Sequence, residues 1–169
     1  MLKIENLVKK YGTFTAVDNL NLNLAKGDIY GFVGPNGAGK TTTMRVVATL
    51  MEATAGTVLV DGINVAEHPV KVRGKLGYMP DFFGVYDNLK VDEYMDFYGS
   101  CYGLPKAERG KRADELLELV DLRDKKANYV DTLSRGMKQR LCLARSLIHN
   151  PELLILDEPA SGMDPRARI

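Results

Sequence analysis

The sequence predicts an α/β fold, and three observations lead to this prediction. Two short, continuously apolar segments, 29–33 and 153–156, are typical of strands covered on both faces. A glycine-rich loop follows the first segment and precedes an apolar repeat at helical spacing over 40–51. A mainly helical stretch, 81–150, separates the loop from the second segment. We therefore expect an α/β core with a helical block inserted in it.

The N-terminal part of the sequence predicts short strands joined by tight turns. Residues 2–9 form the first expected strand, and Asn and Leu alternate over 19–24. This alternation predicts a half-buried antiparallel strand with Leu20, Leu22 and Leu24 on its inner face. Segments 57–60 and 63–65 flank Asp-Gly, a pair that suits a two-residue hairpin turn, and 75–79 is a further expected strand.

The helical block contains two clear amphipathic patterns. Their apolar positions are Ala113, Leu116, Leu117 and Val120 in one helix, and Met137, Leu141, Ala144 and Ile148 in the other. The second helix is expected to stop at 149–151, where a proline follows. The two cysteines fall in helices of this block, which favours reduced thiols over a disulfide or a zinc site.

Composition excludes several classes of protein. The 169 residues suit about one domain, and a net charge of +1 gives no overall attraction to nucleic acid or anionic lipid. The basic run 106–112 lacks interleaved aromatic residues, so it is interpreted as a solvated helix face and no nucleic-acid partner is expected. No apolar run approaches the roughly 18 residues of a membrane span, and 1–6 does not resemble a signal peptide.

The glycine-rich loop matches the pattern G-x-x-x-x-G-K-[ST] in full. Its residues are Gly34, Pro35, Asn36, Gly37, Ala38, Gly39, Lys40 and Thr41. Glycines let the backbone N–H groups of such a loop point at a phosphate, and the helix N-terminus adds partial positive charge. The lysine supplies a point charge to the β and γ phosphates, and the threonine hydroxyl is a Mg²⁺ ligand. A chance glycine-rich turn is the alternative, and the strand and helix around the loop favour a nucleotide site.

Two further segments suit a nucleotide site. The apolar segment 153–156 leads into Asp157, a candidate Mg²⁺ ligand, and Glu158, a candidate general base. The alternative is an acidic helix cap after a core strand. Ser134 opens a helix with a glycine close behind, so it is either a plain cap or a second anion site. A second phosphate site so far along the chain predicts that two subunits share each nucleotide.

Together these residues resemble the nucleotide-binding domain of ATP-binding-cassette (ABC) ATPases, over essentially the whole chain. Residues 34–41 match the Walker A loop and 153–158 the Walker B strand with its glutamate. Residues 133–137 stand where the LSGGQ signature belongs, and 161–164 resemble the D-loop. Tyr11 stands where the family has an adenine-stacking aromatic residue; an ordinary strand-end tyrosine is the alternative.

The resemblance implies a fold and a division of the chain. The fold is a P-loop NTPase core with a mostly parallel sheet, an N-terminal antiparallel β subdomain and an inserted helical subdomain. One domain would comprise 1–80 with the Walker A loop, 81–150 with the signature motif, and 151–169 with Walker B and the D-loop. The family's switch histidine lies on a strand beyond the D-loop helix, and neither His68 nor His149 replaces it. The chain is therefore expected to be an incomplete domain that alone binds nucleotide poorly and hydrolyses little.

The resemblance also implies ATP and Mg²⁺ as cofactors and assigns roles to residues. The catalytic set is Glu158, Lys40 and Asp81, and the metal set is Thr41, Asp157 and Asp81. The nucleotide contacts are the eight loop residues together with Tyr11, Thr42, Ser134, Arg135, Gly136 and Asp164.

Three positions depart from the family pattern. Asp81 replaces a glutamine that contacts Mg²⁺ and senses the membrane partner. Arg135 replaces the first signature glycine. Its side chain either faces a γ-phosphate or points to solvent, and the solvent orientation is slightly preferred. Met137 replaces the signature glutamine.

The expected function is that of an ATP-hydrolysing transporter subunit. It would pair head to tail with a second copy or a similar domain and drive an integral-membrane subunit. Its place would be cytoplasmic, at the inner face of the membrane, and the motif wording resembles bacterial drug and multidrug exporters. A soluble ABC ATPase acting on nucleic acid or ribosomes, and a nucleotide-regulated interaction module, are the alternatives. Part of the aromatic segment 82–86 is a hypothetical docking patch for the membrane subunit, with a subdomain core as the alternative.

Overall fold

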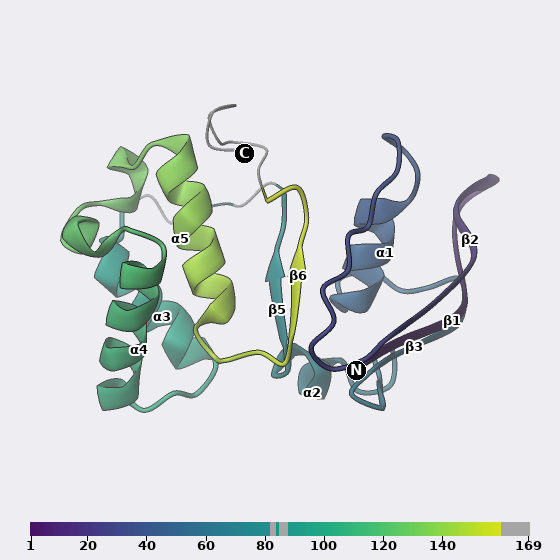
Figure 1. The fold of residues 1–169 in the computed structure, drawn as a ribbon, viewed down its shortest axis with the longest axis horizontal. Coiled ribbons are helices and arrows are strands. Elements are labelled where there is room, and N and C mark those ends of the chain that lie inside the picture. Colours follow the sequence, from purple (N-terminus) through teal and green to yellow (C-terminus); the bar gives the residue numbers. More distant parts are fainter. Residues whose placement is uncertain (82–83, 85–87, 160–169) are drawn as a thin grey trace. The chain divides into compact units, whose positions relative to one another are not determined.

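A computed structural model of the chain describes residues 1–81, 84 and 88–159 (Figure 1). The chain divides into two compact units, Met1–Leu76 and Gly77–Ile169. An antiparallel sheet, a parallel sheet and helices are present, so the predicted α/β class is confirmed. The expected division into one domain with three parts stays a prediction.

The first unit is built on a four-stranded antiparallel sheet of order β2-β1-β3-β4. Its strands are β1 (Leu2–Tyr11), β2 (Phe14–Leu24), β3 (Ala55–Val60) and β4 (Ile63–Asn64). In β2 the three expected leucines are half-buried between exposed asparagines, as the alternation predicts. The strand begins earlier than expected, because Phe14 already pairs with Tyr11 in the hairpin.

The hairpin between β3 and β4 is confirmed. Val60 pairs with Ile63, and Asp61 and Gly62 between them have φ angles of 51° and 75°. Two successive left-handed residues define the turn whose twist matches the flanking strands. Lys75 Nζ lies 2.7 Å from the Asp61 carboxylate, and this hydrogen bond lowers the pKa of Asp61.

Two helices belong to the first unit, α1 (Lys40–Val47) and α2 (Pro69–Arg73). The sequence predicted that the first would run to residue 51. It ends sooner because Thr49 has a φ of 60°, which breaks the right-handed helix. Val46 and Val47 of α1 are buried core residues of the unit.

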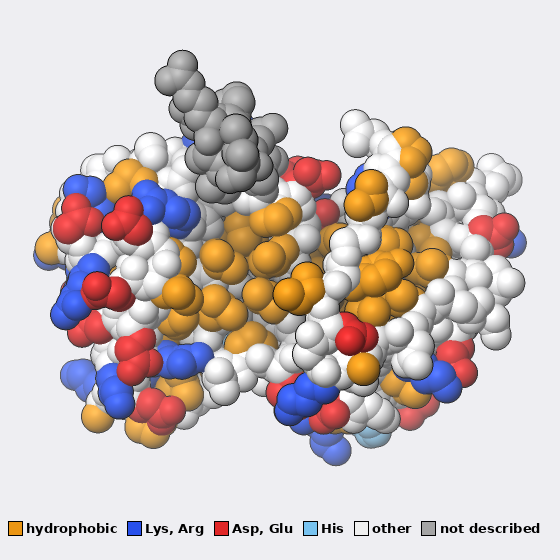
Figure 2. Space-filling view, in the orientation of Figure 1, with side chains coloured by type: hydrophobic (Ala, Val, Ile, Leu, Met, Phe, Trp, Pro, Cys, Tyr) orange, Lys and Arg blue, Asp and Glu red, His pale blue; other side chains and the backbone are white. Residues whose placement is uncertain are grey.

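The strand expected over 29–33 is absent, which corrects the prediction. Residues 28–35 are irregular in the structure, and the side chains of Ile29 and Val33 are 101% and 94% exposed. A strand exists only through hydrogen bonds to a neighbouring strand, and none of the described residues pairs with this segment. Figure 2 shows apolar side chains gathered on the visible face of the first unit.

The second unit combines a two-stranded parallel sheet with helices. The strands are β5 (Leu76–Met79), whose first residue closes the first unit, and β6 (Leu153–Leu156). The helices are α3 (Val91–Cys101), α4 (Lys106–Leu119) and α5 (Arg135–Leu147), with the 3₁₀ turns η1 (Arg123–Lys125) and η2 (Val130–Thr132). β6 is half-buried rather than fully buried as expected, because β5 is its one partner among the described residues.

The predicted helix faces form the core of the second unit. Leu117, Leu141 and Ala144 are fully buried, and Met137 packs against the same cluster. Positive and negative side chains intermingle over the helices on the face shown in Figure 2. In the described part of the chain, no helix combines the length and apolar character that crossing a membrane requires.

Candidate functional site

The glycine-rich loop of the first unit requires glycine at two positions. Gly37 and Gly39 both have a φ of 82°, in the left-handed region. A Cβ on Gly39 would lie 2.3 Å from the carbonyl oxygen of Ala16 and 3.0 Å from Val17 Cγ2, whereas one on Gly37 would meet nothing within 4 Å. Gly39 therefore fixes the loop against β2, and Gly37 leaves open space beside it.

Lys40 is folded back onto its own loop. Its ammonium donates hydrogen bonds to the carbonyl oxygens of Gly34, at 2.7 Å, and Pro35, at 2.9 Å. These contacts hold the positive charge at the loop, where a bound phosphate would need it. An ammonium has three N–H donors, so these two hydrogen bonds do not exclude a further one to a phosphate oxygen.

The start of α1 suits an anion. Gly39 is the N-cap residue and supplies no side-chain cap, and the first turn contains no acidic residue. The partial positive charge of the helix N-terminus is thus not neutralised by a carboxylate from its own first turn. Thr41 and Thr42 of this turn are partly buried.

Tyr11 lies at the same end of the sheet as the loop. The register places Lys9 opposite Val17 and Lys10 opposite Thr15, so Ala16, the residue against Gly39, lies directly across from the end of β1. The Tyr11 hydroxyl donates to Met51 Sδ at 3.0 Å, and Lys9 Nζ lies 5.3 Å from the centre of its ring. These contacts with Met51 and Lys9 orient the Tyr11 ring, which stays exposed to solvent.

In the second unit, Asp157 lies directly after β6. Its side chain is only 3% exposed, and its backbone N–H donates to the carbonyl oxygen of Met79 at 2.9 Å. This bond places Asp157 beside the end of β5, just before Pro80 and Asp81. Asp81 is exposed. The structure thus brings Asp81 and Asp157 to the same edge of the parallel sheet.

Glu158 has an unusual backbone conformation. Its φ is 52°, in the left-handed region. Seven described non-glycine residues have positive φ, and five of them are Asn or Asp, which tolerate this region. Thr49 and Glu158 are the other two. The side chain of Glu158 is exposed, on a turn that no residue preference explains.

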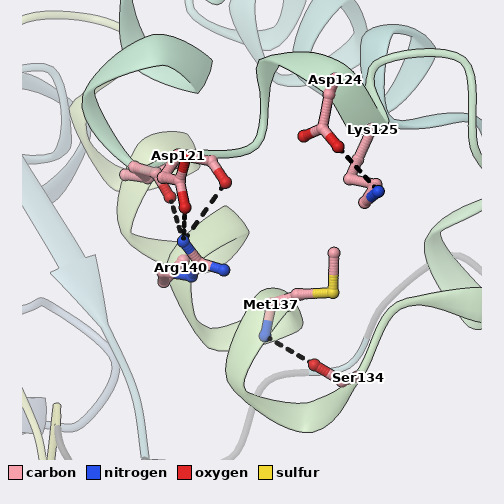
Figure 3. A network of polar contacts seen from close by, with 7 residues as sticks. Asp121, Asp124, Lys125, Ser134, Met137 and Arg140 are labelled. Atoms are coloured by element: carbon pink, nitrogen blue, oxygen red, sulfur yellow. Dashed lines mark hydrogen bonds and ion pairs between the residues drawn. The ribbon is translucent and has the colours of Figure 1, made fainter. Parts of the chain in front are cut away.

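Ser134 caps the helix α5 that carries the signature-like segment. Its hydroxyl accepts the backbone N–H of Met137 at 3.3 Å (Figure 3), and α5 has no acidic residue in its first turn. Arg135 is exposed, consistent with the preferred solvent orientation, and Gly136 is partly buried. Met137 packs against the helical core, and this contact accounts for an apolar side chain at this position.

Arg140 fixes the first half of α5 to the end of α4. Its guanidinium donates to the carbonyl oxygens of Val120, at 2.9 Å, and Asp121, at 3.2 Å, and to the Asp121 carboxylate at 3.1 Å (Figure 3). Nearby, the hydrogen bond from Lys125 lowers the pKa of Asp124. The sequence pattern does not single out Arg140, because an arginine in a basic segment carries no sign of what it contacts.

The expected site residues fall into two sets. The loop, Thr42 and Tyr11 belong to the first unit, and Asp81, Ser134, Arg135, Gly136, Asp157 and Glu158 to the second. Asp164 with the rest of the 161–164 segment, and the aromatic residues Phe82, Phe83 and Tyr86, lie outside the described residues. Gln139 is a buried polar residue that the sequence pattern does not single out. It contacts the Glu158 turn.

Comparison with known proteins finds relatives that are all described as ABC transporter or ATP-binding proteins. A family model described as "ABC transporter" matches residues 17–161. Linearmycin resistance ATP-binding protein LnrL of Bacillus subtilis (strain 168) is 40% identical over 168 residues, which are 99% of this chain and 54% of that protein. Bacitracin transport ATP-binding protein BcrA of Bacillus licheniformis is 42% identical over 165 residues, 98% of this chain and 53% of that protein.

A solved structure is also similar. It is a dimeric, post-hydrolysis state of the ATP-binding cassette MJ0796 bound to ADP and Pi, with a TM-score of 0.87 and 30% identity. The match covers 98% of this chain and 77% of that one. The chain spans about half the length of the two curated relatives named above. Because the family model matches most of its residues, the chain belongs to the ABC transporter family.

Proposed function

We propose that this chain is the ATP-binding and ATP-hydrolysing part of an ABC exporter. The observation that carries the proposal is the loop at the start of α1. Two left-handed glycines, an acid-free helix N-terminus and the ammonium of Lys40 meet there, and each of these features favours a phosphate group.

The proposed chemistry is hydrolysis of the γ-phosphate. A water oxygen attacks the γ-phosphorus, the bond to the bridging oxygen breaks, and ADP leaves with the bond's electrons. Glu158 orients the water and accepts its proton, which then passes to solvent. Thr41 and Asp157 supply a hydroxyl and a carboxylate, the oxygen ligands that Mg²⁺ prefers, and the ion would neutralise phosphate charge.

The proposed setting is a transporter. LnrL and BcrA carry the words "resistance" and "transport" in their names, which favours an exporter over a soluble ABC ATPase acting on nucleic acid or ribosomes. The net charge of +1, which gives no overall attraction to nucleic acid, also favours this choice. We assign the chain a membrane subunit as partner, a second ATPase domain for pairing, and a place at the cytoplasmic face of the membrane.

Substitution of Glu158 by glutamine tests the proposed reaction. The change removes the proton acceptor and keeps the shape, so turnover of the full-length protein should fall about 100-fold or more while ATP binding persists. Phosphate release and ATP titration measure the two effects. Turnover equal to that of the wild type would remove Glu158 from the mechanism.

A further inference from the structure

Gln139 joins helix α5 to the turn that contains Glu158. Its side chain is 4% exposed, and its Nε2 donates to the carbonyl oxygen of Pro159 at 2.6 Å and to that of Glu158 at 3.4 Å. The two hydrogens of one amide nitrogen thus serve two successive carbonyl groups of the turn.

The surroundings dictate the orientation of this amide. Gln139 Oε1 is buried and has no hydrogen-bond partner among the described residues. Rotating the amide would place that oxygen against two carbonyl oxygens, which repel it. The observed orientation therefore leaves one acceptor unsatisfied in order to keep both donations, and such an orphaned atom calls for an explanation.

The turn needs a restraint from outside. The backbone of Glu158 is left-handed, a conformation that costs about 1–2 kcal/mol for a residue with a side chain. Glycine, Asn and Asp adopt it at lower cost, but glutamate is none of these. Such conformations persist where the surrounding structure fixes them. The Gln139 amide contacts this residue and the one after it, so it supplies part of that restraint.

We propose that Gln139 is a positioning residue for Glu158, and that it sets the direction of the catalytic carboxylate by holding the backbone of its turn. This inference rests on the proposed function. Gln139 lies on the helix that Ser134 caps, so a displacement of α5 would pull directly on the glutamate turn. Helix α5 and the general base would then move as one body during the reaction.

Two substitutions of equal length test the proposal in the full-length protein. Gln139→Met removes the donors and keeps an apolar side chain of similar size, and Gln139→Glu replaces them with a carboxylate that faces two carbonyl oxygens. Both should lower kcat about tenfold or more, since a positioned general base contributes about 10²–10⁴-fold. The KM for ATP should stay within about twofold of the wild-type value.

Ser146→Ala is the matched control. Ser146 is also a buried polar residue on α5, but its hydroxyl donates within the helix, to the carbonyl oxygen of Leu143 at 2.8 Å. Its kcat and KM should equal those of the wild type. If it lowers kcat as much as Gln139→Met does, the effect comes from loss of packing in α5 and the proposal is wrong.

A double substitution separates positioning from general damage. In a Glu158→Gln background, Gln139→Met should lower turnover no further, because the carboxylate that it positions is already gone. A further tenfold loss, or an unchanged kcat in both single variants, overturns the proposal and leaves the proposed function standing. Absence of ATP turnover in the wild type overturns both.

Discussion

Alanine at Gly39 and at Gly37 provides a paired test of how the phosphate loop is built. The two glycines share a φ of 82°, so alanine suffers the same backbone penalty at both positions. They differ in their surroundings. The new Cβ meets open space at Gly37, but at Gly39 it lies 2.3 Å from the carbonyl oxygen of Ala16.

The free energies follow from these two terms. A left-handed alanine costs about 1–2 kcal/mol. At Gly39 the contact is more than 1 Å inside the 3.4 Å at which ordinary van der Waals contact begins, and the obstructing atom belongs to the backbone of β2. Overpacking of this kind costs about 1–3 kcal/mol more. We therefore expect a loss of about 1–2 kcal/mol for Gly37→Ala and about 2–5 kcal/mol for Gly39→Ala.

Urea unfolding followed by far-ultraviolet circular dichroism measures the difference. An unchanged slope with a lower midpoint would show that stability alone has changed. Equal midpoints for the two variants would refute the reasoning, because the contact between Gly39 and β2 would then contribute nothing.

Three further predictions concern other parts of the chain. Lys40→Ala should weaken ATP binding about tenfold or more, since a hydrogen bond to a charged group contributes about 1.5–3 kcal/mol, and near-normal affinity in a titration would contradict the loop assignment. Arg140→Met should lower the free energy of unfolding by about 1–3 kcal/mol, because it leaves the carbonyl oxygens of Val120 and Asp121 without their donor. An unshifted thermal midpoint would contradict this prediction. Iodoacetamide should label exposed Cys101 in the folded protein but buried Cys142 only after unfolding, since burial also raises the pKa of its thiol. Mass spectrometry distinguishes the two thiols, and equal labelling would contradict the packing of α5.

The fold could be predicted where the signal is local. Alternating Asn and Leu fixed the half-buried face of β2, and Asp61 with Gly62 fixed the hairpin, because these patterns act between neighbouring residues. The strand expected over 29–33 failed for the opposite reason. Apolar character favours a strand, but a strand needs a partner that its own residues do not encode. The early end of α1 depends on Thr49, a residue type that gives no warning of a left-handed turn.

The site divides in the same way. Gly37, Gly39 and Lys40 could be found from sequence because the loop needs those residue types in that order. Gln139 could not, because its partners are carbonyl oxygens 19 and 20 residues further along the chain, and every residue has a carbonyl. The roles assigned to Asp81, Asp157 and Tyr11 stay predictions.

The folded-back lysine is positioned for an anion in advance. Its two hydrogen bonds to carbonyl oxygens of the loop hold the ammonium in place, and the third N–H of such a group can donate to a phosphate oxygen while both contacts persist. Ordering a loose lysine side chain at the moment of binding would instead cost about 0.5–1.5 kcal/mol. A change that weakens those two carbonyl contacts, with the lysine intact, would therefore weaken nucleotide binding without removing any contact to the nucleotide.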